Sequence, residues 1–169
     1  MILTIRKYGD PVLRKKAAAI TRITPELTEL ARDMIETMRE EPGVGLAAPQ
    51  VGESIRLMVF EVPNLRLGPT AYINPEIIAT RGMVKGDEGC LSIPEINGEV
   101  SRHQWVKVKA QTLDGKEVTV EYEDLPARVM QHEMDHLDGV LFVDRLNPIK
   151  RALIYNKLKK LSSYDYTIS

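Results

Sequence analysis

Cysteine, histidine and aromatic residues are scarce in this chain: its 169 residues include one cysteine and three histidines, and aromatic residues make up 5%. The single cysteine, Cys90, excludes a disulfide within the chain and suits a reducing cytoplasm. No stretch is apolar over the length of a membrane span, and the apolar run in residues 1–6 is too short for a signal peptide. A net charge of −1 argues against nucleic-acid binding through bulk electrostatics. We therefore expect a soluble cytoplasmic protein.

The composition predicts a single globular unit. Hydrophobic residues make up 43% of the sequence, which is enough for one core, and no Pro-, Gly- or Ser-rich linker divides the chain. We expect a single catalytic domain over residues 1–147. A C-terminal helix and tail over residues 148–169 should pack on the same domain.

The order of the expected elements indicates an α+β fold. Capping and helical periodicity predict an amphipathic helix over residues 25–40. The β-rich segments that follow are 55–62, 71–73, 105–110 and 118–122. Asp124 is expected to cap a second helix that begins at Leu125 and ends before Gly139. The regular strand-helix alternation of a parallel α/β sheet is missing, which favours α+β.

The last expected helix opens at Asn147 and Pro148. Its apolar residues are expected to face inward: Leu153, Ile154, Leu158 and Leu161. Its basic residues are expected to face outward: Lys150, Arg151, Lys157, Lys159 and Lys160. Against Asp165, these five give the segment a charge of +4, which leaves −5 for the rest of the chain. Such a face is usually only solvated, but a role in binding a partner stays open.

The most informative motif is His-Glu-x-x-His at residues 132–136. On a helix, His132 and His136 lie one turn apart and can hold one divalent ion, while Glu133 can reach a water molecule bound to that ion. Val129 and Leu125 lie on the same side of the helix as the histidines, nearer its start. The metal-binding side of the helix should therefore continue into an apolar surface, and strands should half bury it.

The third metal ligand has to come from elsewhere in the chain. No glutamate follows His136, and Phe142 occupies the last histidine position of the extended zinc-protease motif. His103, Cys90 or an aspartate could complete the set, and we favour Cys90 because of its neighbours in residues 88–92. One thiolate and two imidazoles leave a fourth position open, which is typical of a catalytic site.

Residues 43–50 form a glycine-containing segment that superficially fits a dinucleotide-binding fingerprint. The context is wrong for that function, because a helix precedes it and Pro49 follows. A plain glycine turn is one interpretation. The other is close approach of the backbone to an extended peptide substrate, with Gln50 as an amide donor.

Three segments together, residues 43–50, 88–92 and 131–136, resemble the signature set of the peptide deformylase family. The likeness extends over nearly the whole chain. It implies an α+β fold with β-sheets surrounding a central metal-binding helix. It also implies a metal-dependent hydrolase that removes the formyl group from the N-terminal formylmethionine of nascent polypeptides and releases formate.

The resemblance implies a role for each motif residue. The metal ligands would be Cys90, His132 and His136. Glu133 would exchange protons with the metal-bound water, and the Gln50 amide and Leu91 backbone N–H would stabilise the oxyanion. The family metal is typically Fe²⁺, with Zn²⁺, Ni²⁺ or Co²⁺ as substitutes, although ligand softness alone favours zinc.

The substrate-binding residues that the resemblance implies are Val44, Gly45, Glu88, Gly89 and Val129. Val44, Gly45 and Val129 resemble positions that hold the methionine side chain or the substrate backbone, although ordinary core packing remains an alternative for the two valines. Glu88 also resembles one half of an ion pair with Arg102 near the site.

The chain departs from many relatives at two positions. Asn97 stands near the place of an arginine that helps hold the peptide backbone, and Arg128 replaces a common apolar residue.

The polar C-terminal helix resembles the family form that can dock on the ribosome, and its positive charge suits an RNA-rich surface. We therefore expect nascent formylated peptides as substrate, the ribosome as a partner and no membrane.

Two other functions remain open at this stage. A metallopeptidase that cleaves ordinary peptide bonds would share the helix motif, but its downstream ligand is missing. A structural metal module would need a fourth protein ligand, for which His103 is the one spare histidine.

Overall fold

The computed structural model describes residues 1–63 and 68–162. Its α-helices are α1 (Pro25–Glu40), α2 (Leu125–Leu137) and α3 (Pro148–Ser162). Its strands are β1 (Gly45–Ala47), β2 (Leu57–Phe60), β3 (Thr70–Arg81), β4 (Val84–Cys90), β5 (Ile93–Arg102), β6 (Trp105–Gln111) and β7 (Glu117–Glu123). Short 3-10 helices are η1 (Pro11–Arg14), η2 (Ala48–Val51) and η3 (Phe142–Arg145).

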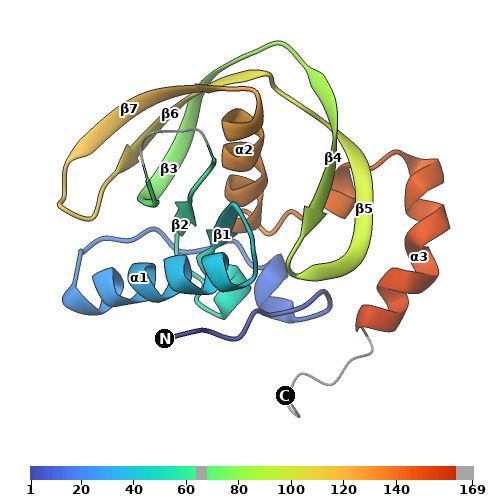
Figure 1. Cartoon of the computed structure of the whole chain (residues 1–169), viewed down its shortest axis with the longest axis horizontal. Coiled ribbons are helices and arrows are strands. Elements are labelled where there is room, and N and C mark those ends of the chain that lie inside the picture. Colours follow the sequence, from blue (N-terminus) through green and yellow to red (C-terminus); the bar gives the residue numbers. More distant parts are fainter. Residues whose placement is uncertain (64–67, 163–169) are drawn as a thin grey trace.

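The strands form two antiparallel sheets. One has five strands in the order β1-β2-β3-β6-β7, and the other is the β4–β5 hairpin. In Figure 1, α2 lies near the centre, between the larger sheet and the hairpin, while α1 and α3 lie on the outside. The α+β prediction is confirmed, with β-sheets on both sides of the helix that carries the histidine motif. Among the described residues, none of the helices has the length and hydrophobicity of a transmembrane segment.

The hairpin formed by β4 and β5 is the main element that the sequence prediction missed. Residues 84–102 are rich in glycine and charge, which lowers strand propensity. The alternation of buried and exposed residues along β5 is nevertheless regular from Ile96 to Arg102. The prediction also ended β3 too early, since the strand continues to Arg81.

Helix α2 begins and ends where the sequence predicts, but its cap differs from the prediction. The Asp124 side chain makes no capping hydrogen bond; it accepts a hydrogen bond of 3.4 Å from the Gln104 side chain instead. The positive φ of Asp124, 58°, turns the chain sharply into the helix, which is not the geometry of a capping residue. At the other end, Gly139 has a φ of 75°, as expected for a glycine that ends a helix.

Helix α3 presents a different face to the core from the predicted one. Ile154 and Leu158 are buried and Leu161 packs beside them, as expected. Leu153, which was predicted to face inward, is 73% exposed. Only a narrow stripe of this helix is buried, and among the helices and strands it packs mainly against β5. The Asn147 side chain does start the helix, since its oxygen accepts a hydrogen bond of 2.8 Å from the Lys150 N–H.

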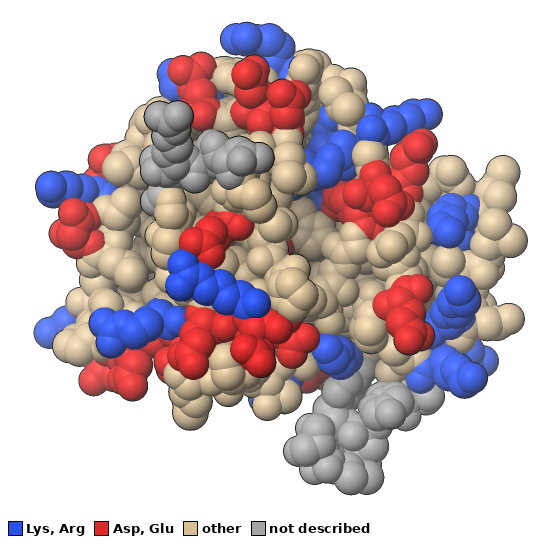
Figure 2. Space-filling view, viewed as in Figure 1, with Lys and Arg blue, Asp and Glu red and all other residues tan. Residues whose placement is uncertain are grey.

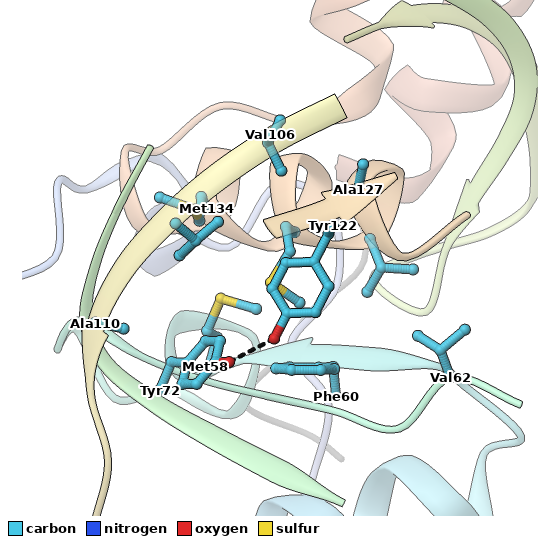
Figure 3. Packing of buried hydrophobic residues seen from close by; sticks show 12 residues of the cluster. Met58, Phe60, Val62, Tyr72, Val106, Ala110, Tyr122, Ala127 and Met134 are labelled. Carbon is cyan, nitrogen blue, oxygen red and sulfur yellow. Dashed lines mark hydrogen bonds between the residues drawn. The ribbon is translucent and has the colours of Figure 1, made fainter. Parts of the chain in front are cut away.

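The core on the sheet side of α2 is apolar. Ala127 and Met134 of the helix face aromatic residues of the large sheet (Figure 3). The ring of Phe60 lies 5.2 Å from that of Tyr72 and 5.9 Å from that of Tyr122. The hydroxyls of the two tyrosines hydrogen-bond to each other, so neither polar atom is left unsatisfied. This packing fixes the position of α2 and therefore of the histidines on its other side.

Candidate metal centre

Three potential metal ligands meet between α2 and the end of β4. Cys90, His132 and His136 offer ligand atoms that all lie within 4.8 Å of one another. Cys90 Sγ is 3.4 Å from His136 Nε2, and the two histidine rings are 5.1 Å apart. The helical spacing of four residues places both imidazoles on one side of α2, and the cysteine approaches from the neighbouring hairpin.

An irregularity in the hairpin brings Cys90 to this position. The pairing of β4 with β5 shifts register between Glu88 and Cys90, and Cys90 is the last residue of β4. Such irregularities re-aim a side chain out of a regular ladder and are common beside functional sites. His103, another candidate from the sequence, lies elsewhere: its Nδ1 is 3.1 Å from the Gly82 carbonyl oxygen, and the residue is not part of the cluster.

Glu88 fixes the orientation of His132. The Glu88 carboxylate lies 2.9 Å from His132 Nδ1 and accepts two hydrogen bonds of 2.9 Å from Arg102. Burial alone would raise the pKa of Glu88, but the hydrogen bonds from His132 and Arg102 outweigh it and lower the pKa to about 2. An ionised carboxylate can only accept, so Nδ1 of His132 carries a proton, and Nε2 is the ring nitrogen left to bind a metal.

The buried ion pair between Glu88 and Arg102 is part of a longer network. Arg102 also donates a hydrogen bond of 2.6 Å to Asp135, which in turn accepts two hydrogen bonds from Arg145, of 2.6 and 2.8 Å. The sequence suggested the Glu88–Arg102 pair, but the part played by Arg145 was missed. Nothing in local sequence indicates which charged residues meet across such separations.

Glu133 stands beside the cluster with one oxygen unsatisfied. Its Oε1 is 3.6 Å from His132 Nε2. Its Oε2 is buried and has no hydrogen-bond partner in the described part of the chain. Burial raises the pKa of Glu133 to about 7. A carboxyl group with a free acceptor and a pKa near neutrality is suited to proton transfer.

Gly45 of β1 allows the strand to pass close to Glu133. A Cβ at this position would lie 2.9 Å from Cγ of Glu133 and 3.0 Å from a methyl group of Val129. Any larger residue would therefore push the strand away from α2. This contact explains Gly45 by close approach of β1 to α2. Close approach of residues 43–50 to a peptide substrate stays a prediction.

Gln50 and Leu91 lie beside the cluster. The side-chain oxygen of Gln50, Oε1, accepts a hydrogen bond of 3.0 Å from the Ala47 N–H. This contact turns the side-chain nitrogen of Gln50 toward the site. That nitrogen is 3.2 Å from Ser92 Oγ and 3.5 Å from Cys90 Sγ. Leu91 directly follows Cys90, and its carbonyl accepts a hydrogen bond of 3.0 Å from Lys7 Nζ.

A pocket of about 520 Å³ opens over these residues. It is lined by all five residues that were predicted to bind substrate: Val44, Gly45, Glu88, Gly89 and Val129. Gln50, Cys90, Leu91, His132 and Glu133 also line it. The space-filling view shows this face hollowed near its centre, between the large sheet and the β4–β5 hairpin (Figure 2). Lys7, Leu125 and Arg128 line the same pocket, and the sequence had not singled them out as site residues.

The residues present fit a bound transition-metal ion. One sulfur and two imidazole nitrogens converge, and the orientation of His132 is fixed by a carboxylate, as is usual for metal-binding histidines. The buried, unpartnered oxygen of Glu133 adds an acceptor for a water molecule or substrate beside them. Three protein ligands leave a tetrahedral ion one open position. The fold and this site are those of a metal-dependent hydrolase with the His-Glu-x-x-His motif.

Comparison with known proteins identifies the family. The family model described as polypeptide deformylase matches residues 2–152. Peptide deformylase 1 of Clostridium acetobutylicum is 54% identical over 145 residues, which cover 86% of this chain and 95% of that protein. The peptide deformylase of Syntrophobacter fumaroxidans is 48% identical over 161 residues, which cover 94% of this chain and 95% of that protein. The chain belongs to the peptide deformylase family.

Solved structures agree with this assignment. The crystal structure of peptide deformylase from Thermus thermophilus matches with a TM-score of 0.89 and 43% identity, over 95% of this chain and 98% of that one. A peptide deformylase from Legionella pneumophila gives a TM-score of 0.89 and 41% identity, over 95% of both chains. Family membership confirms the resemblance read from the three motifs.

Proposed function

We propose that this chain hydrolyses the formamide bond of N-terminal formylmethionine on nascent polypeptides, which releases formate and a free amino terminus. The observation that carries the proposal is the convergence of Cys90, His132 and His136 beside Glu133 at the base of one pocket. Membership of the peptide deformylase family supplies the reaction. The shape of the pocket, open on one side and lined by two strand edges, suits the end of an extended peptide.

Cys90, His132 and His136 would hold a single divalent ion. When bound, such an ion polarises the formyl oxygen and lowers the pKa of a water molecule, which makes a nucleophile available at neutral pH. We favour Fe²⁺, which the family resemblance implies, with Zn²⁺, Ni²⁺ or Co²⁺ as substitutes. The mixed sulfur and nitrogen donor set is compatible with each of these metals.

Glu133 is the proton-transfer residue in this mechanism. It takes a proton from the water that attacks the formyl carbon. As the C–N bond breaks, it delivers a proton to the departing amine nitrogen, and the former formyl group leaves as formate. Glu133 lines the pocket and its Oε2 has no other hydrogen-bond partner among the described residues, so the carboxylate is available to accept that proton.

Gln50 and Leu91 would stabilise the charge that develops on the formyl oxygen. The side-chain nitrogen of Gln50 is held toward the cluster because Oε1 of the same amide accepts a hydrogen bond from the Ala47 N–H. The Leu91 N–H is the second donor, and it follows the ligand Cys90 directly in the chain. A preorganised donor of this kind typically contributes about 3 kcal/mol to transition-state stabilisation.

The substrate backbone would lie between β1 and the end of β4. Gly45 and Gly89, one from each element, both line the pocket, where an extended peptide could pair with the strand backbones. Val44 and Val129 offer an apolar surface for the methionine side chain. Glu88 lines the same pocket, but its carboxylate is fully engaged in hydrogen bonds, so it acts by holding His132.

The direct test is formate release from formyl-Met-Ala-Ser by anaerobically purified protein of known metal content. We expect formate from the formylated peptide and no cleavage of unblocked Met-Ala-Ser. A preparation that lacks the Cys90 thiol, Cys90→Ala, should lose both its metal and its activity. Absence of formate from fully metallated wild-type protein would contradict the proposed function.

We also propose that α3 docks on the ribosome. Its Lys and Arg side chains gather on the outer side of the molecule, over α3 in Figure 2. Helix α3 (Pro148–Ser162) packs on the rest of the chain through Ile154 and Leu158, as expected for a C-terminal extension of a domain over residues 1–147. This role would place the enzyme in the cytoplasm, where ribosomes make new chains. Asp165, which was counted in the predicted charge of +4, lies outside the described residues.

Ribosome docking can be tested without removing the helix. Lys157 and Lys159 are exposed, so Lys157→Glu together with Lys159→Glu should preserve the fold. Cosedimentation with ribosomes at low salt should fall for this variant and remain for the control Glu121→Lys, a charge change on the distant strand β7. Unchanged cosedimentation of the lysine variant would contradict docking through α3.

A further inference from the structure

Arg128 joins the hairpin that carries Cys90 to the helix that carries the histidines. It lies on α2, one turn before His132, and its side chain is 15% exposed. Nη1 donates to Glu88 Oε2 at 2.5 Å and to the Val100 carbonyl at 2.9 Å. Nη2 donates to the Val84 carbonyl at 2.7 Å. One guanidinium group from α2 therefore binds both strands of the hairpin.

The contact with Glu88 completes the hydrogen bonding of that carboxylate. Oε1 of Glu88 faces His132 Nδ1 and Arg102 Nη2, and Oε2 accepts from Arg102 Nε and Arg128 Nη1. Two oxygens offer about four acceptor positions, and all four are used. Arg102 is shared with Asp135 on α2, so it does not belong to Glu88 alone. Arg128 holds Oε2 from the other side and keeps Oε1 aligned with His132.

The position of the hairpin depends on such side chains. The backbone of α2 packs mainly against β1, β2, β7 and η2, while β4 and β5 approach it less closely. The three metal-binding residues are nevertheless divided between α2 and β4. Their mutual distances therefore depend on the groups that connect the two elements, and Arg128 connects α2 to the backbone of both hairpin strands.

Gly86 supplies independent support. A Cβ on Gly86 would lie 3.0 Å from Cζ of Arg128 and 3.1 Å from its Nε, so the guanidinium lies against the bare backbone of β4. Gly86 is paired with Val100, whose carbonyl is one of the Arg128 acceptors. The hairpin thus has a glycine at the place where the arginine crosses it.

We propose that Arg128 is a positioning residue for the metal centre: by clamping Glu88 and the β4–β5 hairpin to α2, it sets how tightly the Cys90, His132 and His136 site binds its ion. The proposal rests on the proposed metal site and adds a determinant of its affinity. It predicts an effect on binding of Zn²⁺ alone, in the absence of any substrate.

The first test measures Zn²⁺ affinity by competition with a chromophoric chelator. Arg128→Met should weaken Zn²⁺ binding by roughly tenfold to a hundredfold, the range typical of residues that orient metal ligands. Arg128→Lys should recover only part of the loss, because a single ammonium group cannot reproduce the arginine fork. The control is Arg81→Met, which removes an arginine that stacks on Trp105 away from the site and should leave the affinity unchanged.

The second test uses Gly86→Ala, which keeps the arginine but crowds it. This variant should weaken Zn²⁺ binding less than Arg128→Met and in the same direction. Because its effect acts through Arg128, the double variant Gly86→Ala/Arg128→Met should bind Zn²⁺ as Arg128→Met does. Additive losses in affinity would show that the glycine acts independently and would overturn this part of the argument.

A spectroscopic measurement separates positioning from general loss of stability. The visible absorption of the Co²⁺-substituted protein reports the thiolate and imidazole geometry, and we expect it to change in Arg128→Met and to stay as in wild type in Arg81→Met. Wild-type Zn²⁺ affinity and an unchanged Co²⁺ spectrum in Arg128→Met would overturn the proposal. In that case the proposed function would stand as long as wild type released formate; failure of wild type to bind metal would instead remove the function itself.

Discussion

The two faces of α2 are held in place by opposite kinds of contact. Toward the large sheet, Ala127, Met130 and Met134 pack among buried apolar residues (Figure 3). Toward the β4–β5 hairpin, His132 and Asp135 meet carboxylate and guanidinium groups. One side of the helix is therefore embedded in a hydrophobic core and the other in a charged network.

This difference separates stability from geometry. Burial of one large apolar side chain contributes about 1.5–3 kcal/mol to folding, whereas a buried ion pair contributes little net stability because its groups lose hydration. A hydrogen-bonded pair is directional, however, and can fix an imidazole in one orientation. We expect substitutions on the apolar face to change the free energy of unfolding, and substitutions on the polar face to change metal binding and catalysis.

The largest effect after loss of the catalytic base or a ligand is expected at Gln50. Gln50→Ala removes one donor to the developing oxyanion and should lower kcat by about 10²- to 10³-fold. The metal content should stay at the wild-type level, since Gln50 is not one of the converging ligands. Steady-state formate release with metal analysis measures both. A variant with wild-type kcat would remove Gln50 from the mechanism.

An effect of similar size, but on stability, is expected at Met130. This residue is completely buried on the apolar face of α2. Met130→Ala should reduce the free energy of unfolding by about 2–5 kcal/mol, as measured by urea denaturation, because it leaves a cavity. Formate release per folded, metallated molecule should change little at low temperature. A large loss of specific activity with intact stability would break the division between the two faces.

A smaller effect on metal binding is expected at Glu88. Glu88→Gln keeps the size of the side chain but replaces an acceptor of His132 Nδ1 with a neutral amide. Zn²⁺ affinity should fall by about ten- to a hundredfold in a chelator competition assay. A charge change at an exposed site, Glu99→Gln on β5, serves as the control. Equal Zn²⁺ affinities in the two variants would contradict the role of Glu88.

The smallest effect is expected at the tyrosine pair in the apolar core. Tyr122→Phe removes one hydrogen bond to Tyr72 and should cost about 1 kcal/mol at neutral pH. Burial raises the pKa of both hydroxyls above the ordinary value of 10.0. A group whose pKa is raised in the folded state stabilises the protein below pH 10, and that contribution is lost as the pH rises further. Wild type should therefore lose stability above pH 10 more steeply than Tyr122→Phe, and parallel curves would contradict this reasoning.

The sequence predicted the parts of the site that depend on local spacing. The repeat of four residues between His132 and His136 places both on one helix face wherever a helix forms, and Gly139 marks the helix end. The unusual neighbours of Cys90 favoured it over His103, and the structure brings Cys90 to the histidines. Short-range patterns of this kind survive folding because they do not depend on distant partners.

The parts that the sequence did not predict depend on tertiary contacts. The hairpin of β4 and β5 was missed because its glycines and charges weaken the strand pattern. At Gly86 and Gly89 the missing side chain leaves space for side chains from elsewhere in the fold. The three acceptors of Arg128 lie between 28 and 44 residues away in the chain. Asp124 does not cap α2, because the backbone turns into the helix with a conformation unlike that of a capping residue. Leu153 is exposed, because only a narrow stripe of α3 is buried.

The most direct test of the central claim is the rate of formate release per bound metal ion in Glu133→Gln, compared with wild type at equal metal content. Loss of the proton-transfer group should lower kcat by about 10²- to 10⁴-fold, while metal content and the free energy of unfolding stay close to those of wild type. A Glu133→Gln enzyme with a full metal complement and wild-type kcat would contradict the proposed mechanism and the assignment of catalysis to this face of α2.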